Sequence, residues 1–209
     1  MKFVIFHGTY GSSSGNWFPY LKKQMELIGQ EVILPQFPID NHEELLKLGP
    51  KKAKAKIQNL DNWLDFFKKN IFKEIKREKK VVFVAHSIGP VFTLRVLEKF
   101  NIQLDCAIFV APFLTVPKMA WDYELATRGF FKEDFNFEKL KKLIPVSYVV
   151  YGDKDPYVDK KYTFEFGSKM GSQFIEVRGG GHLNAEFKFF SFPLVYELCK
   201  TRIDTKEYL

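Results

Sequence analysis

Three side chains of complementary chemistry follow short apolar runs of this sequence. Ser87, Asp155 and His182 each come shortly after such a run. A serine hydroxyl is a weak nucleophile at neutral pH, so it needs a base within hydrogen-bond reach, and a histidine base needs an acid that fixes its tautomer. These residue types therefore predict nucleophilic acyl-transfer chemistry, provided that the fold brings them together.

The apolar runs predict the elements that would position these residues. Six runs of four to six residues read as β strands, and longer helical patterns between them are typical of crossovers between parallel strands. The expected strands are 3–6, 31–34, 81–85, 106–111, 146–151 and 174–177. The expected helices are 17–29, 53–78, 89–100, 137–143, 160–170 and 185–201. Asn136 and Asp159 are expected helix N-caps, and Gly29 and Gly171 are expected C-terminal stops. This rhythm predicts an α/β fold with three layers, α/β/α, around a mostly parallel sheet of about six strands.

The ends of the expected strands carry the chemistry. In open α/β sheets, ligands bind outside the carboxyl ends of the strands. The segments there are His7-Gly8-Thr9-Tyr10, His86-Ser87-Ile88-Gly89, Gly152-Asp153-Lys154-Asp155 and Gly179-Gly180-Gly181-His182. A serine, an acid and a histidine should thus meet at one sheet edge, in the chain order that is typical of α/β-hydrolases.

Ser87 is the predicted nucleophile. Ala85-His86-Ser87-Ile88-Gly89 is a variant of the G-x-S-x-G nucleophile elbow, a strained strand-to-helix turn whose flanking residues must be small. A literal match also occurs at Gly11-Ser12-Ser13-Ser14-Gly15, which would select Ser13. That run lies beyond a strand end in a Gly/Ser stretch, so its context favours Ser87.

His182 and Asp155 are the predicted base and acid. The other three histidines, His7, His42 and His86, all precede the serine. The spacing Gly-x-x-Asp-x-x-Val favours Asp155 over Asp153, which is expected to bind backbone in its turn. The glycines before His182 would let its loop adopt unusual dihedral angles.

An acyl-transfer site also needs donors for the developing oxyanion. We expect the backbone N–H of Ile88 and that of Thr9, with Tyr10 as the alternative to Thr9. His7 and His86 are expected to be structural.

Composition and charge exclude several classes of protein. With 209 residues, 46% hydrophobic and 27% charged, the chain is expected to form one globular domain over 1–209 rather than a disordered or fibrous protein. No apolar run is long enough to span a membrane, and residues 1–7 turn polar too early for a signal peptide, so the expected location is the cytoplasm. Two cysteines, Cys106 and Cys199, are expected to be reduced and buried.

The net charge of +7 comes mainly from residues 51–56 and 68–80, both patterned like solvated helix faces. No nucleic-acid-reading motif, metal-ligand spacing or phosphate-binding loop accompanies it, so we expect no nucleic-acid partner, no metal and no cofactor. The segment 112–136 lacks clean periodicity, and it is either a short lid facing the substrate or an irregular surface loop.

Nearly the whole chain resembles the small serine hydrolases of the retinoblastoma-binding protein 9 and YdeN family, within the α/β-hydrolase fold. The segments that carry the resemblance are 6–8, 16–23, 35–38, 63–64, 84–89, 152–158 and 180–182. Of these, Asn16-Trp17-Phe18-Pro19 is the more family-specific. The resemblance implies a compact α/β-hydrolase domain with a triad of Ser87, Asp155 and His182. The chain departs from the commonest pattern at Ile88 and in a longer basic stretch at 43–56.

These observations predict a serine hydrolase that cleaves small carboxylic esters through an acyl-enzyme intermediate. A thioesterase or amidase would use the same triad, so the sequence leaves that choice open. A non-catalytic protein-binding scaffold is the other alternative, although a scaffold has no need of serine, acid and histidine at three strand ends.

Overall fold

The fold is built on a single sheet of six parallel strands. The computed structural model describes residues 1–116, 120–131 and 134–204. Neighbouring strands pair in the order β2-β1-β3-β4-β5-β6, all in parallel register. Their bounds are β1 (Lys2–Phe6), β2 (Glu31–Ile33), β3 (Val81–His86), β4 (Cys106–Val110), β5 (Ser147–Gly152) and β6 (Gln173–Val177). All six predicted strands are present, which confirms the α/β class.

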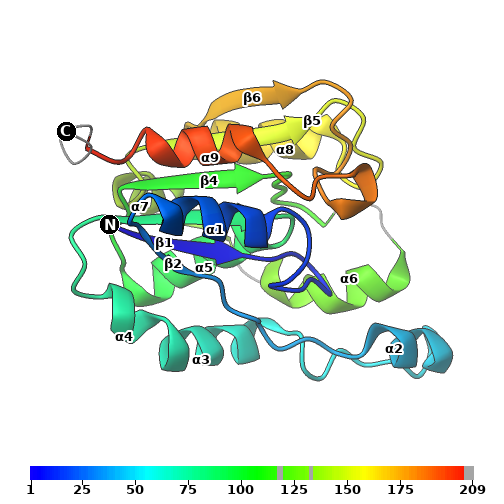
Figure 1. The fold of residues 1–209 in the computed structure, drawn as a ribbon. Helices are drawn as coiled ribbons and strands as arrows, with labels where there is room; N and C mark the ends of the chain where they lie inside the picture. The colour runs from blue at the N-terminus through cyan, green and yellow to red at the C-terminus, as the bar shows by residue number, and fades with distance from the viewer. Residues whose placement is uncertain (117–119, 132–133, 205–209) are drawn as a thin grey trace.

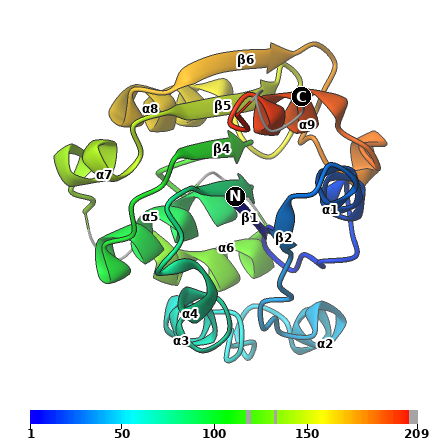
Figure 2. The same ribbon diagram turned by 60° about the vertical axis from the view of Figure 1, so that its left-hand side comes forward.

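Helices cover both faces of this sheet (Figures 1 and 2). Helices α1 and α9 lie on one face, and α3, α5 and α8 lie on the other, so the molecule has the predicted three layers. The α helices are α1 (Phe18–Leu27), α2 (His42–Leu48), α3 (Leu60–Asn70), α4 (Phe72–Ile75), α5 (Gly89–Phe100), α6 (Trp121–Thr127), α7 (Phe137–Leu143), α8 (Lys160–Met170) and α9 (Pro193–Lys200). Two short 3₁₀ turns are η1 (Arg128–Phe131) and η2 (Ala185–Phe187).

The apolar core is divided by the sheet into two clusters. In β1, Val4 and Phe6 face the α3, α5 and α8 layer, whereas Phe3 and Ile5 face the layer of α1 and α9. All four are at most 1% exposed. Because alternate side chains of a strand point to opposite faces, a strand buried on both sides must be apolar throughout. This explains why the four inner strands, β1, β3, β4 and β5, appear in the sequence as largely apolar runs.

The predicted helix ends are present at several positions. The side chains of Asn136 and Asp159 cap α7 and α8 by accepting N–H groups of their first turns. Gly171 ends α8 in the left-handed conformation, and Gly29, also at positive φ, follows the end of α1. Helices α7 and α8 begin and end where they were predicted, at 137–143 and 160–170.

Two long predicted helices were wrong in extent. Residues 185–201 do not form one helix, because Lys188 at φ +64° ends η2 and a new helix begins only at Pro193. Likewise, residues 53–78 do not form one helix. The N-cap Asn59 precedes α3, and Ile71 separates α3 from the short helix α4. Residues 51–59 are therefore turns and loop, and the lysines there lie on an exposed loop rather than on a helix.

The segment 112–136 contains two elements that the sequence did not predict. Helix α6 and turn η1 lie within it, and 117–119 and 132–133 are outside the described residues. Phe130 of η1 is fully buried against Trp63 and Phe92, so the described part of the segment is anchored to the core. Helix α2 was also missed, and it packs against α6.

Surface and cysteine features complete the fold. Within the described residues, no helix is both long enough and apolar enough to cross a membrane. Cys106 and Cys199 are free and buried, as predicted.

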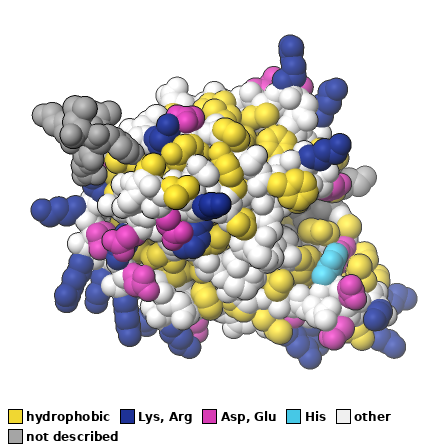
Figure 3. Space-filling model, viewed as in Figure 1, with side chains coloured by type: hydrophobic (Ala, Val, Ile, Leu, Met, Phe, Trp, Pro, Cys, Tyr) yellow, Lys and Arg dark blue, Asp and Glu magenta, His cyan; other side chains and the backbone are white. Residues whose placement is uncertain are grey.

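On the face shown in Figure 3, many lysine and arginine side chains project from the lower left, where Figure 1 places α3 and α4. Apolar and acidic side chains lie around the histidine visible at the right-hand end, toward which the strands point.

Candidate active site

Ser87 occupies a strained turn between β3 and α5. Its φ is +62°, a left-handed value that side-chain-bearing residues seldom adopt, and its N–H is held by the carbonyl of Val110 at 2.9 Å. A Cβ atom on Gly89 would lie 3.1 Å from the carbonyl oxygen of Phe6 and 3.3 Å from Cβ of Ala85. The small residues on both sides of the serine thus let α5 start close against the sheet, as the elbow motif predicts.

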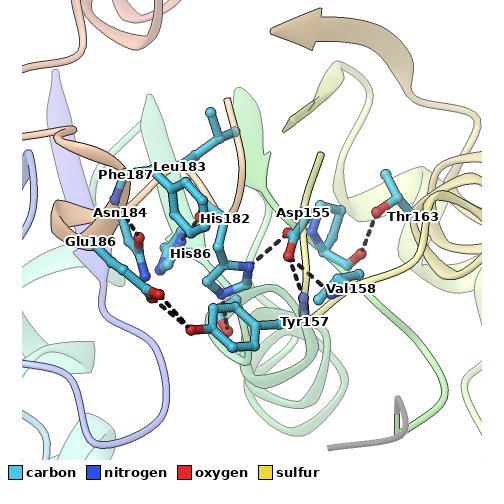
Figure 4. A network of polar contacts seen from close by, with 12 residues as sticks. His86, Asp155, Tyr157, Val158, Thr163, His182, Leu183, Asn184, Glu186 and Phe187 are labelled. Carbon is cyan, nitrogen blue, oxygen red and sulfur yellow. Dashed lines mark hydrogen bonds and ion pairs between the residues drawn. The ribbon is translucent and has the colours of Figure 1, made fainter. Parts of the chain in front are cut away.

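A continuous hydrogen-bond chain joins Ser87, His182 and Asp155, and Figure 4 shows the part of it between His182 and Asp155. Nδ1 of His182 lies 2.7 Å from Oδ2 of Asp155, and Nε2 lies 3.2 Å from Oγ of Ser87. Because a carboxylate only accepts, Nδ1 carries the proton and Nε2 is free to accept the serine hydroxyl. The side chains of His182 and Asp155 are 9% and 5% exposed, so this hydrogen-bond chain is shielded from water.

Asp155 is held in its ionised form. Burial opposes ionisation, but hydrogen bonds from His182 and from the backbone N–H groups of Tyr157 and Val158 outweigh it and hold the pKa of Asp155 below its usual value. Its neighbour Asp153 instead accepts the backbone N–H of Gly179. The structure therefore brings Asp155, and not Asp153, to the histidine.

The loop that carries His182 is tied to distant parts of the chain. His86 donates from Nε2 to the carbonyl oxygen of His182 at 2.9 Å, and the indole N–H of Trp17 donates to that of Leu183 at 2.9 Å. The side-chain oxygen of Asn16 accepts the N–H of Ala185. These contacts leave the imidazole little freedom.

His86 is neutral in this arrangement. Since it donates from Nε2 to a carbonyl, Nδ1 is the unprotonated nitrogen, and Nδ1 is buried without a hydrogen-bond partner among the described residues. Burial and the proximity of His182 lower the pKa of His86 to about 3. The sequence indicated only that this histidine is structural, and no local signal pointed to its contact 96 residues away.

The loop after β1 approaches the serine closely. A Cβ atom on Gly8 would lie 2.9 Å from Cβ and 3.4 Å from Oγ of Ser87, so only glycine fits there. Thr9 and Tyr10 are the central residues of a turn closed by the hydrogen bond from Gly11 N–H to Gly8 C=O. This places the predicted donor of Thr9 in the loop beside the nucleophile.

Tyr10 is engaged elsewhere. Its N–H donates to Oε1 of Gln58 at 2.9 Å, its hydroxyl donates to the carbonyl of Asp122, and its ring stacks on His42 at 4.3 Å between centroids. His42 is in turn hydrogen-bonded to the carboxylate of Asp122 on α6. Because Gln58 occupies its amide, Tyr10 is the weaker of the two candidates for the oxyanion site.

His7 holds the other side of this turn. Its Nε2 accepts the N–H of Phe37 at 3.0 Å, while Nδ1 lies 2.8 Å from the carbonyl oxygen of Gly8. Burial lowers the pKa of His7, which keeps the ring neutral. Its contacts are those of the predicted packed, turn-holding residue.

A cavity of about 310 Å³ opens above the serine. Its lining includes Gly8, Thr9, His86 and Ser87 and the apolar side chains of Phe113, Ala120 and Val158. Tyr157, Asn184 and Glu186 also line it, and sequence reasoning singled out none of these three for the site. Tyr123, a further lining residue, lies in the segment 112–136, for which a substrate-facing lid was one of the two expectations. Ser13 is not among the lining residues, and its N–H donates instead to the side chain of Gln36.

A sequence profile of the serine hydrolases matches residues 3–201 of the chain. The chain belongs to the serine hydrolase family. Among its relatives is YdeN of Bacillus subtilis, a protein named as a hydrolase, which is 26% identical over 197 residues covering 93% of this chain and 92% of YdeN. The YdeN relationship confirms the predicted subgroup of serine hydrolases.

Solved structures of other hydrolases share the fold of this serine hydrolase. The crystal structure of the Bacillus subtilis ydeN gene product superposes with a TM-score of 0.78 at 24% identity, over 96% of this chain and 97% of that one. Est1E of Butyrivibrio proteoclasticus, solved with ferulic acid bound, gives a TM-score of 0.66 at 16% identity, over 96% and 86% of the two chains. These likenesses establish the α/β-hydrolase fold.

Proposed function

We propose that this serine hydrolase cleaves small carboxylic esters through an acyl-enzyme intermediate on Ser87, His182 and Asp155. The observation that carries the proposal is the hydrogen-bond chain from the buried carboxylate of Asp155 through His182 to Oγ of Ser87. This chain has the polarity that nucleophilic catalysis needs, with the basic nitrogen facing the hydroxyl.

Each residue has a defined role in the proposed reaction. Nε2 of His182 takes the hydroxyl proton as Oγ of Ser87 attacks the ester carbonyl, and the same nitrogen then gives that proton to the departing alcohol. A water molecule, activated in the same way, cleaves the acyl-serine ester and releases the acid. Asp155 keeps its negative charge throughout, and it stabilises the imidazolium while holding the ring in its working tautomer.

Backbone amides are the proposed oxyanion donors. The N–H of Ile88 stands at the start of α5, directly after the nucleophile, and the N–H of Thr9 lies in the turn that touches Ser87. Donors of this kind act on the charge that develops on the carbonyl oxygen, which is usually the largest single contribution to catalysis.

The cavity supports small acyl substrates. Its volume of about 310 Å³ lies at the lower end of ligand pockets, and its walls are mostly apolar. Ala120 and Tyr123 place the start of α6 at this cavity, so we assign this described part of the segment 112–136 a substrate-facing role. Est1E, a structural relative, binds ferulic acid, which is a small carboxylic acid.

Labelling with a fluorophosphonate probe tests the proposed nucleophile. The wild type and Ser13→Ala are expected to react at one serine, whereas Ser87→Ala is expected to remain unlabelled. Absence of labelling in the wild type would instead favour the non-catalytic scaffold. A chain-length series of p-nitrophenyl esters tests the substrate class, and activity that rises steeply with long acyl chains would contradict it.

A further inference from the structure

The cavity has a distinct rim beside His182. The ring of Tyr157 packs edge-on against the imidazole of His182, with 5.2 Å between centroids and an interplanar angle of 84°. Its hydroxyl reaches the carboxylate of Glu186, at 2.7 and 2.9 Å from the two oxygens. Figure 4 shows the Tyr157 ring on one side of His182 with its hydroxyl directed at Glu186, away from Asp155.

The carboxylate of Glu186 retains capacity to bind a ligand. A phenol has one proton to donate, so Tyr157 satisfies only part of what two carboxylate oxygens can accept. Within the described residues, Glu186 forms no ion pair with a lysine or arginine, whereas Glu176 and Glu197 are paired with Lys160 and Lys200. Among the described residues that line the cavity there is likewise no lysine or arginine. The described part of this cavity's rim is therefore acidic, although the chain carries a net charge of +7.

Aromatic rings lie beside this charge. Tyr123 and Tyr157 both line the cavity and are 39% and 44% exposed. The hydrogen bond to Glu186 raises the pKa of Tyr157 to about 12, so its phenol stays neutral and protonated at working pH. Neutral aromatic rings attract cations through their negative faces, and quaternary ammonium groups are commonly recognised in this way.

The reaction geometry assigns this rim to the leaving group. In the proposed mechanism, His182 gives its proton to the departing alcohol, so that alcohol must lie beside His182. Tyr157 contacts the same ring, and Glu186 follows His182 by four residues, in the short 3₁₀ turn η2. The apolar walls formed by Phe113 and Val158 are left for the acyl group.

We propose that Glu186, Tyr157 and Tyr123 form a subsite for a positively charged leaving group. The preferred substrates are then small-acyl esters of cationic alcohols, an inference that rests on the proposed esterase function. In the reaction, the acyl carbon bonds to Oγ of Ser87 as its bond to the alcohol oxygen breaks, and the serine proton passes through His182 to that oxygen. The cationic group undergoes no bond change and contributes only binding energy.

A matched pair of esters isolates the charge. Choline acetate and 3,3-dimethylbutyl acetate have the same acyl group and nearly the same shape, and they differ in carrying a quaternary nitrogen or a quaternary carbon. The measured quantity is the ratio of kcat/KM for choline acetate to kcat/KM for the neutral ester. The variants are Glu186→Gln, which keeps an acceptor for Tyr157, Glu186→Lys, and Glu197→Gln as a surface control with an exposed carboxylate on α9.

The wild-type ratio is expected to exceed one, and to fall about fivefold in Glu186→Gln, the effect of a strong exposed ion pair. Glu186→Lys should lower it further, Glu197→Gln should leave it unchanged, and about 0.5 M salt should reduce the wild-type preference. If the wild type cleaves the neutral ester but its ratio matches that of Glu186→Gln, the subsite is overturned and the esterase proposal stands. If neither ester is cleaved and the fluorophosphonate probe leaves Ser87 unlabelled, both proposals fail.

Discussion

Oε1 of Gln58 accepts the backbone N–H of Tyr10 across 48 residues of sequence, and in doing so it fixes the turn that carries Thr9. Both partners are unusual. Tyr10 adopts a φ of +50°, and Nε2 of the fully buried Gln58 has no partner among the described residues. Strained backbone and unsatisfied buried groups cost free energy and are concentrated at functional sites. The carboxylate of Asp40, which accepts the N–H groups of residues 56–58, holds Gln58 in place.

Replacing Gln58 with methionine should therefore impair catalysis more than binding. Methionine has a similar length but only a weak acceptor for the Tyr10 amide, so the turn can relax and the Thr9 N–H moves away from the developing oxyanion. We expect kcat to fall about tenfold or more with KM nearly unchanged. Gln103→Met, at an exposed glutamine bound to the carbonyl of Lys142, is the matched control. An equal loss in both variants, or a change confined to KM, would exclude this role.

The two aspartates of the loop after β5 should differ sharply. Asp155→Asn can turn its amide toward His182 and favour the wrong tautomer, for which the expected loss in kcat is about 10⁴-fold. Asp153→Asn keeps an oxygen that can accept the N–H of Gly179, so its loss should be at most a few-fold. Ester hydrolysis measured on both variants decides between them, and a comparable loss in each would refute the assignment of Asp155 as the acid.

Gly8→Ala should disable the site through a steric clash. The added methyl group would lie 2.9 Å from Cβ of Ser87, so either the loop or the nucleophile must move. We expect at least a tenfold loss of fluorophosphonate labelling rate, because small displacements of reacting groups are costly. Gly129→Ala, where an added Cβ meets nothing within 4 Å, should label like the wild type. Normal labelling of Gly8→Ala would show that the close approach is unimportant.

His86 should make the protein sensitive to acid. Its pKa of about 3 in the folded state lies below the ordinary value of 6.5, so the unfolded chain binds more protons between these values and stability falls as the pH is lowered through that window. Between pH 7.5 and pH 5 this histidine alone should cost about 2 kcal/mol. His86→Gln keeps a donor for the carbonyl of His182 and removes this proton. Urea unfolding at the two pH values should show a smaller pH-dependent loss in the variant, and an identical loss would disprove the role of His86.

The parts of the molecule that the sequence predicted depend on local or repeated signals. The four inner strands β1, β3, β4 and β5 were predictable because parallel strands buried on both faces leave largely apolar runs. The edge strands β2 and β6 are partly exposed, and their short β-branched or aromatic runs were the signal for them. The meeting of Ser87, Asp155 and His182 was predictable because strand ends of a parallel sheet lie at one edge. Their catalytic roles remain a proposal that the labelling experiment tests.

The parts that the sequence did not predict depend on contacts between distant segments. The pairing of Gln58 with Tyr10 leaves no periodic trace, because each partner is unremarkable in its own neighbourhood. Helices α2 and α6 are only seven residues long, too short for an apolar stripe to stand out, and they pack against each other. The break between η2 and α9 follows from a left-handed Lys188, which its residue type did not indicate.

The bonds of Trp17 to Leu183 and of Asn16 to Ala185 also constrain how the enzyme is made. The partners are 166 and 169 residues apart, so on a ribosome the early segment is synthesised long before the loop that it must hold. The nascent chain can form β1 to β5 before His182, whose Nε2 is the proposed base for Ser87, has been synthesised. The proposed triad is therefore complete only once His182 has been synthesised, and truncated chains that stop before the sixth strand are expected to be inert toward the fluorophosphonate probe.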